Sequence, residues 1–237
     1  MIVTRLIMLA FLFCLTACEK EELHFKEGDM EITVLPGEQW LHDFPLFLGL
    51  KQKNTPQFAI WIEDISGNYL TTIFVTHKIA TEGWIFNKGN RRKETLPHWC
   101  HQRGVVYEDG LLLPTKKQPL ADGITGATPQ GRKTIQVALK SIEKPFVVKA
   151  EFNHSIDFNS NFPVDAVEGA ENYSGGEMGS GQPAVVYAAI IYPDTREASL
   201  QPIGHSSPDG TDGSIYENLD KLTTARDIVQ NIKITIW

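Results

Sequence analysis

Histidine and cysteine gather in one short stretch of the chain, His98-Trp99-Cys100-His101, and His77 and His205 are among the histidines that lie elsewhere. Imidazole and thiolate groups are good ligands for zinc or copper. In an extended segment His98 and Cys100 would share a face, because alternate strand residues point the same way. No second closely spaced ligand pair completes a closed metal site. We favour the alternative, a half-buried strand or loop with polar rims, and assign neither a metal ligand nor a catalytic residue.

A second chemistry-bearing run, Asp122-Gly-Ile-Thr-Gly-Ala-Thr128, ends in a threonine hydroxyl. It resembles the Asp-x-x-(Ser/Thr)-Gly-Ala-Thr acceptor of proteins that receive FMN, through a phosphoester on the final threonine, from an exported flavin transferase. Small residues before the acceptor leave the backbone open to a transferase. Pro129 disfavours the helical region for Thr128, so its side chain is expected to project. The resemblance implies covalent FMN on Thr128, with Asp122 assisting the transferase or its metal; Thr125, Gly126 and Ala127 complete the implied site.

The same run has a structural explanation that stays open. A tight, glycine-containing loop could feed a strand that begins at Lys133, with Asp122 and Thr125 capping backbone groups as such residues do in turns. If FMN is attached, the flavin supplies the redox chemistry, and the protein positions the flavin and sets the electrostatic field around it.

A third run, from Asp209 to Glu217, is rich in acidic and hydroxyl oxygens, which are calcium ligands. It lacks the ligand spacing of the helix-loop-helix calcium loop. Aspartate, proline and glycine also form turns on their own account, and we favour a surface turn here.

The N-terminus has the pattern of a lipoprotein export signal. One cation, Arg5, precedes an apolar stretch from Leu6 to Leu15, which is too short to span about 30 Å of hydrocarbon. Leu15-Thr16-Ala17-Cys18 then matches the run that a lipoprotein signal peptidase cuts. We expect residues 1–17 to be a signal peptide, Cys18 to carry the anchoring lipid, and 18–28 to be an acidic tether. An ordinary secretory signal or an uncleaved anchor is the alternative. The lipoprotein interpretation predicts a bacterial protein at the periplasmic face or the cell surface.

Charge and size narrow the class of protein further. Removing Arg5 with the leader leaves 21 Lys plus Arg against 29 Asp plus Glu, a net charge of about −8. Because nucleic-acid affinity comes largely from cations, nucleic acid is disfavoured as a partner. Residues 29–237 are enough to bury a substantial core as one domain, and a single cysteine there, Cys100, offers no intrachain disulfide.

Short β-branched and aromatic runs between turn signals predict a mainly β protein with mostly antiparallel strands. Long loops are expected at about 82–96, 159–182 and 203–220. Thr223-Thr224 offers an N-cap for one short helix, Ala225–Val229, near the C-terminus. The expected strands are Met30–Leu35, Gln57–Glu63, Tyr69–His77, Lys133–Leu139, Phe146–Asn153, Ala184–Tyr192, Ser199–Gly204 and Ile232–Ile236.

Several segments together resemble a family of predicted periplasmic bacterial proteins of unknown function: Pro56 to Asn68, Leu96-Pro-His-Trp99, the run Asp122 to Thr128, and Gly181 to Tyr187. The resemblance implies an Ig-like, flagellar-hook-cap-like β-sandwich. In that fold a strand with an Asp-x-x-Gly turn is followed by a Gly-x-x-x-hydrophobic strand, here Gly131 to Val137. The family brings no activity with it.

Two functions follow from these patterns. The first is a lipid-anchored extracytoplasmic protein that carries covalent FMN on Thr128 for electron transfer, with a flavin transferase and a redox protein as partners. The second is a cofactor-free β-sandwich lipoprotein that binds or assembles components of the cell envelope. We expect that neither acts as a stand-alone enzyme; a hydrolase is a further alternative, for which the sequence offers no catalytic residues to name.

Overall fold

The protein is built mainly from β-strands, as the sequence predicts. The computed structural model describes residues 29–45, 48, 50–84, 90–120, 123–127, 130–139 and 144–237. In these ranges, the α-helices α2 (His77–Ala80) and α3 (Pro97–Arg103) and the 3-10 helices η2 (Gly176–Met178) and η3 (Thr224–Asp227) accompany the strands. The strands are β1 (Met30–Pro36), β2 (His42–Pro45), β3 (Lys51–Asn54), β4 (Gln57–Asp64), β5 (Tyr69–Thr76), β6 (Ile124–Gly126), β7 (Lys133–Val137), β8 (Phe146–Asn153), β9 (Val185–Ile191), β10 (Glu197–Ser199), β11 (Gln201–His205) and β12 (Val229–Ile236).

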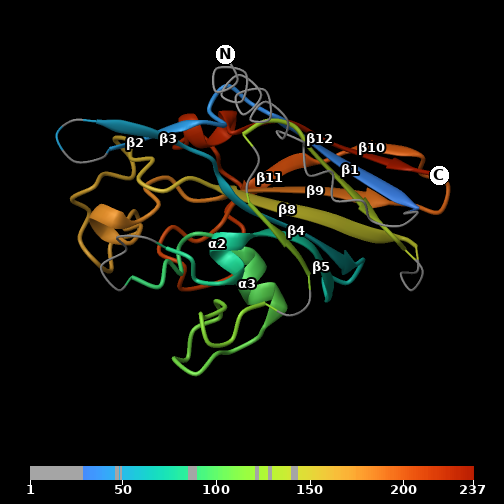
Figure 1. Cartoon of the computed structure of the whole chain (residues 1–237), viewed down its shortest axis with the longest axis horizontal. Coiled ribbons are helices and arrows are strands. Elements are labelled where there is room, and N and C mark those ends of the chain that lie inside the picture. Colours follow the sequence, from blue (N-terminus) through green and yellow to red (C-terminus); the bar gives the residue numbers. More distant parts are fainter. Residues whose placement is uncertain are drawn as a thin grey trace, which may run out of the picture.

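Two sheets form the layers of a β-sandwich (Figure 1). The smaller sheet has the strand order β10-β12-β1-β7, and the larger has the order β11-β9-β8-β4-β5-β6. The edge strand β6 runs parallel to β5, whereas the central pairs of the larger sheet are antiparallel. The strands β2 and β3 form a separate hairpin at one end of the sandwich (Figure 1).

The main core lies between the two sheets. Strand β1 buries every second side chain from Met30 to Val34, the alternation expected of a strand with one covered face. From the opposite sheet, the Phe58 ring stacks on Phe152 and Phe74, with ring centroids 4.6 and 4.9 Å apart. Such aromatic pairs add to the free energy gained by burying apolar surface.

A second apolar cluster covers the outer face of the larger sheet. Strand β4 is buried on both faces, which explains its continuous apolar run. Phe58 and Ile60 of β4 belong to the core between the sheets, whereas Ala59 and Trp61 pack in the cluster that contains residues of α2 and α3. Figure 1 shows both helices packed against this side of β4 and β5. The larger sheet is therefore a middle layer.

Helix α3 corrects the expectation of an extended segment at His98–His101. It begins with Pro97, whose fixed φ suits the first helical turn, and it ends at Gly104, which has a φ of 64°. Seven residues are too few for a helical hydrophobic period to show in the sequence. The helix predicted at Ala225–Val229 is also changed: it is the 3-10 helix η3, and β12 already begins at Val229.

The strand predicted at Ser199–Gly204 is two strands in different sheets. β10 ends at Ser199 in the smaller sheet and β11 begins at Gln201 in the larger one. The chain crosses between the sheets at Leu200, which is buried and donates its N–H to the carbonyl of Ile232 at 2.9 Å. A continuous β-type pattern in the sequence does not reveal such a change of sheet.

The predicted signal peptide, residues 1–17, and the tether 18–28 with Cys18 lie outside the described residues. Within the described ranges, no helix combines the length and apolarity that crossing a bilayer requires.

Candidate functional site

Three charged or polar side chains meet on the outer face of the larger sheet. Lys149 of β8 places its Nζ 2.9 Å from Oε2 of Glu63 on β4 and 3.1 Å from Nε2 of His98 on α3. The Trp61 indole N–H donates to the second oxygen of Glu63 at 2.7 Å. Because Lys149 pairs with Trp61 across the β4–β8 ladder, the strand register brings these groups together.

The protonation of His98 follows from its partners. Nδ1 lies 2.7 Å from the carbonyl oxygen of Gly213, which can only accept, so Nδ1 carries the proton. Nε2 then accepts from the ammonium of Lys149, which can only donate. Burial lowers the pKa of His98 to about 4, against the raising effect of the Gly213 hydrogen bond. The imidazole is therefore neutral at pH 7 and joins the sheet to the loop that contains Gly213.

The buried side chain of Glu151 caps the N-terminus of α3. Its two oxygens accept the backbone N–H groups of His98 at 3.2 Å and of Trp99 at 2.8 Å. The residue at the N-cap position, Leu96, has no side chain that could do this. Burial raises the pKa of Glu151 to about 7, although hydrogen bonds from Trp99 and Ser206 oppose that shift.

In helix α3, His98 and Cys100 point in different directions, whereas an extended segment would have placed them on one face. His98 faces the sheet, whereas Cys100 packs in the apolar cluster with Trp99 and Leu113. His205 lies on β11, where its ring stacks on Tyr216 at a centroid distance of 5.3 Å. The described residues contain no group of three or more His, Cys, Asp or Glu side chains suited to a metal ion.

The thiol of Cys100 is unsuited to nucleophilic chemistry. It is 2% exposed, and burial, reinforced by the negative charge of Glu151, raises its pKa above the ordinary value. Because the thiolate is the reactive form, the thiol behaves as a small apolar side chain at neutral pH.

The acidic run from Asp209 to Glu217 forms turns. Asp209 Oδ1 accepts hydrogen bonds from the hydroxyl of Ser207 at 2.9 Å and from the N–H and hydroxyl of Thr211 at 3.0 and 2.7 Å. Asp212 accepts from the N–H of Ser214 at 2.7 Å. These bonds occupy the carboxylates within the loop, as expected of aspartates in turns.

The run expected to accept FMN enters the edge of the larger sheet. Ile124–Gly126 forms β6, in which Thr125 and Gly126 pair with Val75 and Thr76 of β5. Thr125 and Gly126 are half-buried and Ala127 is exposed. Asp122 and Thr128 lie outside the described residues. The expectation of a turn in this run is thus corrected in part, because its middle residues form a short strand.

The first described residue of this run, Gly123, packs closely on the sheet. Its φ is +154°, and a Cβ there would lie 3.2 Å from both Thr72 Cγ2 and Leu120 Cδ2. Thr72 in turn accepts the indole N–H of Trp99 at 3.0 Å, and its hydroxyl lies 2.6 Å from that of Tyr69. One threonine therefore connects the strand β6 region with helix α3.

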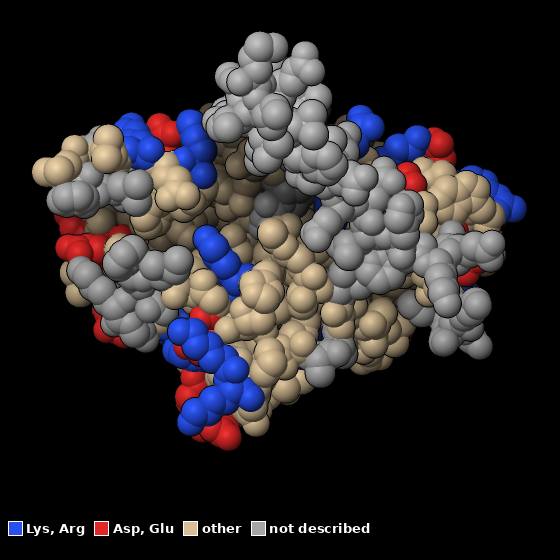
Figure 2. Space-filling view, in the orientation of Figure 1, with Lys and Arg blue, Asp and Glu red and all other residues tan. Residues whose placement is uncertain are grey.

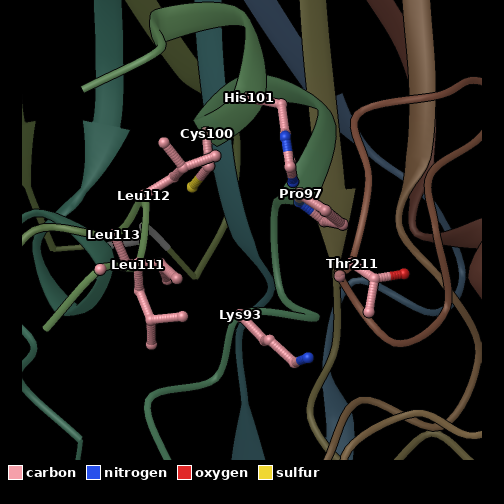
Figure 3. A pocket seen from close by; sticks show the side chains of 10 residues that line it. Lys93, Pro97, Cys100, His101, Leu111, Leu112, Leu113 and Thr211 are labelled. Carbon is pink, nitrogen blue, oxygen red and sulfur yellow. The ribbon is translucent and has the colours of Figure 1, made fainter. Parts of the chain in front are cut away.

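A cavity of about 230 Å³ lies beside α3. Figure 3 shows Pro97, Cys100 and His101 approaching it from α3, and three leucines, Leu111–Leu113, from the loop that follows the helix. In this view Lys93 lies at the bottom of the cavity and Thr211 at its right (Figure 3). The cavity combines an apolar wall with a small number of polar groups, which is the usual composition of a ligand site.

The loop after α3 is fixed in place by Arg91. Its guanidinium donates to the carbonyl oxygens of Leu113 at 2.8 Å and Pro114 at 3.2 Å, and it forms ion pairs with Asp109 and Glu82. Figure 2 shows Lys and Arg side by side with Asp and Glu on the projection that this loop forms. Arg91 thereby holds one wall of the cavity against the rest of the domain.

The fold and the site define a two-sheet β-sandwich protein whose larger sheet carries a helix-covered polar network and a small adjacent cavity. A comparison of the chain with protein-family profiles, curated proteins and solved structures finds no match. The Ig-like periplasmic family therefore stays a prediction.

Sequence reasoning missed the polar network and the cavity. Lys149 and Glu151 occupy alternate positions of β8, the pattern of a solvent-facing strand surface, and nothing local shows that α3 covers them. Glu63 gave a weak signal, because it follows a wholly apolar run and is separated by one residue from Trp61.

Proposed function

We propose that the protein is a lipid-anchored extracytoplasmic component that carries FMN on Thr128 through a phosphoester and takes part in electron transfer. The observation that supports this proposal best is the position of the acceptor run: its described residues form the edge of the larger sheet, and Ala127 is exposed. An edge strand has one unpaired side, which leaves its backbone accessible to a modifying enzyme.

The described residues fit a flavin acceptor in size as well as in position. Gly126 and Ala127 present little side-chain bulk beside the acceptor, and Thr72 packs against Gly123 at the start of the run. A transferase would move the FMN part of a flavin dinucleotide to Thr128: the bond between phosphorus and the threonine oxygen forms, the pyrophosphate bond breaks, a base of the transferase takes the hydroxyl proton, and a nucleoside monophosphate leaves. The attached flavin would supply the redox chemistry, while the sandwich would position it.

Intact mass of the mature protein, coexpressed with a flavin transferase, tests this proposal. We expect a mass increase of one FMN phosphoester, lost in Thr128→Ala and retained in Thr134→Ala, which removes an exposed threonine six positions further along the sequence, on strand β7. An unmodified wild-type mass, or modification that persists in Thr128→Ala, contradicts the proposal.

The membrane anchor has a separate test. Radiolabelled palmitate is expected to enter the wild-type protein and the Cys14→Ser variant, because Cys14 lies in the apolar part of the leader. Labelling should disappear in Cys18→Ser, with release of the protein from the membrane fraction. Equal labelling of the two variants would remove Cys18 as the lipid site.

A second candidate function is a cofactor-free lipoprotein that binds an envelope ligand or partner. The cavity beside α3 favours it, since this cavity is lined by segments that Arg91 and the polar network hold in place. This function requires no modification of Thr128, so the mass experiment separates it from the first.

A further inference from the structure

The cavity beside α3 has one apolar side. Leu111, Leu112 and Leu113 line it together with Pro97 and the thiol of Cys100 (Figure 3). Burial raises the pKa of Cys100, so the thiol carries no negative charge at neutral pH. The cavity has a volume of about 230 Å³, which is below the range typical of pockets for drug-sized ligands. It therefore suits a smaller molecule with a short hydrocarbon part.

The opposite rim carries a cation. The Lys93 side chain reaches along the lower rim of the cavity towards Thr211 in Figure 3. Among the residues that the structure describes, no carboxylate forms an ion pair with Lys93. Burial would raise the pKa of Asp209, but hydrogen bonds from Thr211 and Ser207 and the positive charge of Lys93 lower it, so Lys93 lies within electrostatic reach of this carboxylate. The hydrogen bonds that Asp209 accepts come from the loop, and the Lys93 ammonium keeps its donors for a ligand.

The rim is held rigidly. A Cβ on Gly210 would lie 2.3 Å from the backbone oxygen of Lys93, so the 209–211 turn packs directly on the Lys93 backbone. Arg91 fixes the leucine wall through the carbonyl of Leu113. A preformed arrangement of a cation and an apolar wall loses little conformational entropy when a ligand binds.

From this arrangement we infer that the cavity binds a small monocarboxylic acid, with the carboxylate on Lys93 and the hydrocarbon chain against Leu111–Leu113 and Cys100. One cation opposite an apolar wall matches a single negative charge on an apolar body. Phosphate and nucleotides would require several donors around one anion, which a single lysine does not supply. The inference rests on the second candidate function and is independent of the modification of Thr128.

Binding of hexanoate to the unmodified mature protein, measured by calorimetry, tests the inference. We expect saturable binding with one site, and an affinity that increases about threefold to fourfold per methylene from acetate through butyrate to hexanoate. Lys93→Met keeps the hydrocarbon stem but removes the charge, and it should weaken hexanoate binding at least tenfold. Lys117→Met, at an exposed lysine of the neighbouring loop, should leave the affinity unchanged.

The neutral analogue hexan-1-ol separates failure of the ligand class from failure of the site. Hexanol should bind wild type at least tenfold more weakly than hexanoate does, because it cannot pair with the Lys93 ammonium. Equal affinities of hexanol and hexanoate for wild type would overturn the carboxylate class but retain an apolar ligand site. Absence of saturable binding of either compound at concentrations up to about 10 mM would overturn the binding role of this cavity. Circular dichroism confirms that each variant is folded before its affinity is compared.

Discussion

The backbone N–H of Trp99 donates a 2.8 Å hydrogen bond to Oε2 of Glu151, a strand residue 52 positions further along the chain. The cap of helix α3 therefore comes from the sheet beneath it and not from its own flanking sequence. The same carboxylate is fully buried, which couples the stability of the helix to the protonation of one side chain.

Glu151 makes stability depend on pH. Burial raises its pKa from 4.5 to about 7. Between these values the folded protein holds a proton that the unfolded chain lacks, so the stabilisation present below pH 4.5 is lost as the pH rises through 7. The loss attributable to this group is about 3 kcal/mol. Urea denaturation of wild type and Glu151→Gln between pH 4.5 and 8 measures it, since the variant lacks this titration.

Two histidines change the folding stability with pH in the direction opposite to Glu151. Burial lowers the pKa of His98 and of His154 to about 4. Between pH 6.5 and 4 these histidines are therefore protonated in the unfolded chain but neutral in the folded protein. Their stabilisation is present above pH 6.5 and is lost as the pH falls through 4. Glu151→Gln should therefore lose stability more steeply than wild type on acidification from pH 6.5 to 4.5. Parallel curves for the two proteins would contradict the assignment of Glu151.

The Lys149–Glu63 pair supports a second prediction. The side chain of Glu63 is 1% exposed and that of Lys149 is 14% exposed. Lys149→Met should destabilise the protein by about 3 kcal/mol, because it leaves a buried carboxylate without its cation. Chemical denaturation at pH 7 provides the measurement.

A surface pair provides the matched control. Lys233 and Glu197 lie 2.9 Å apart with side chains 44% and 63% exposed, and Lys233→Met should cost less than about 1 kcal/mol. The double variant Lys149→Met/Glu63→Gln should regain part of the stability lost in Lys149→Met, because the unpaired charge is gone. No recovery would show that lost packing, and not the charge, causes the destabilisation.

The sheet strands could be predicted because their patterns are local. Met30–Val34 alternates buried and half-buried residues, and Phe58–Ile62 of β4 is an unbroken apolar run because both faces of the strand are covered. Helix α3 could not be predicted in this way, because its cap, Glu151, arrives from a distant strand. The short strand β6 depends equally on pairing with β5 and carries no period of its own.

The two candidate sites also differ in whether a local sequence pattern reveals them. The Asp122–Thr128 run is contiguous, so a sequence can reveal it, although its position at a sheet edge required the fold. The cavity is assembled from Lys93, Cys100, Leu112 and Thr211, which come from separate segments. Such a site has no spacing signature, and only the packing of α3 and two loops against the sheet creates it.

Gly181 provides a third prediction, on backbone geometry. Its φ is +79°, it bridges to Asp157, and a Cβ would lie 2.4 Å from the carbonyl carbon of Asp157. Gly67 has a similar φ of +84° but has open space around its Cα. Gly67→Ala should cost about 1 kcal/mol from the left-handed conformation alone, and Gly181→Ala should cost about 3 kcal/mol or more because steric overlap is added. Equal urea midpoints for the two variants would refute the close packing at Gly181.

Cys100 supports the last prediction, on chemical reactivity. Its thiol is 2% exposed and its raised pKa keeps it protonated at pH 8, so alkylation requires the protein to open. In a Cys18→Ser form of the mature chain, iodoacetamide should modify Cys100 no faster than the site opens, and urea should accelerate the reaction. The matched control is Ser66→Cys in a Cys18→Ser/Cys100→Ala background, which places a single thiol in the exposed turn between β4 and β5. Modification of Cys100 at a rate within tenfold of that control would show that the α3 layer does not shield the thiol.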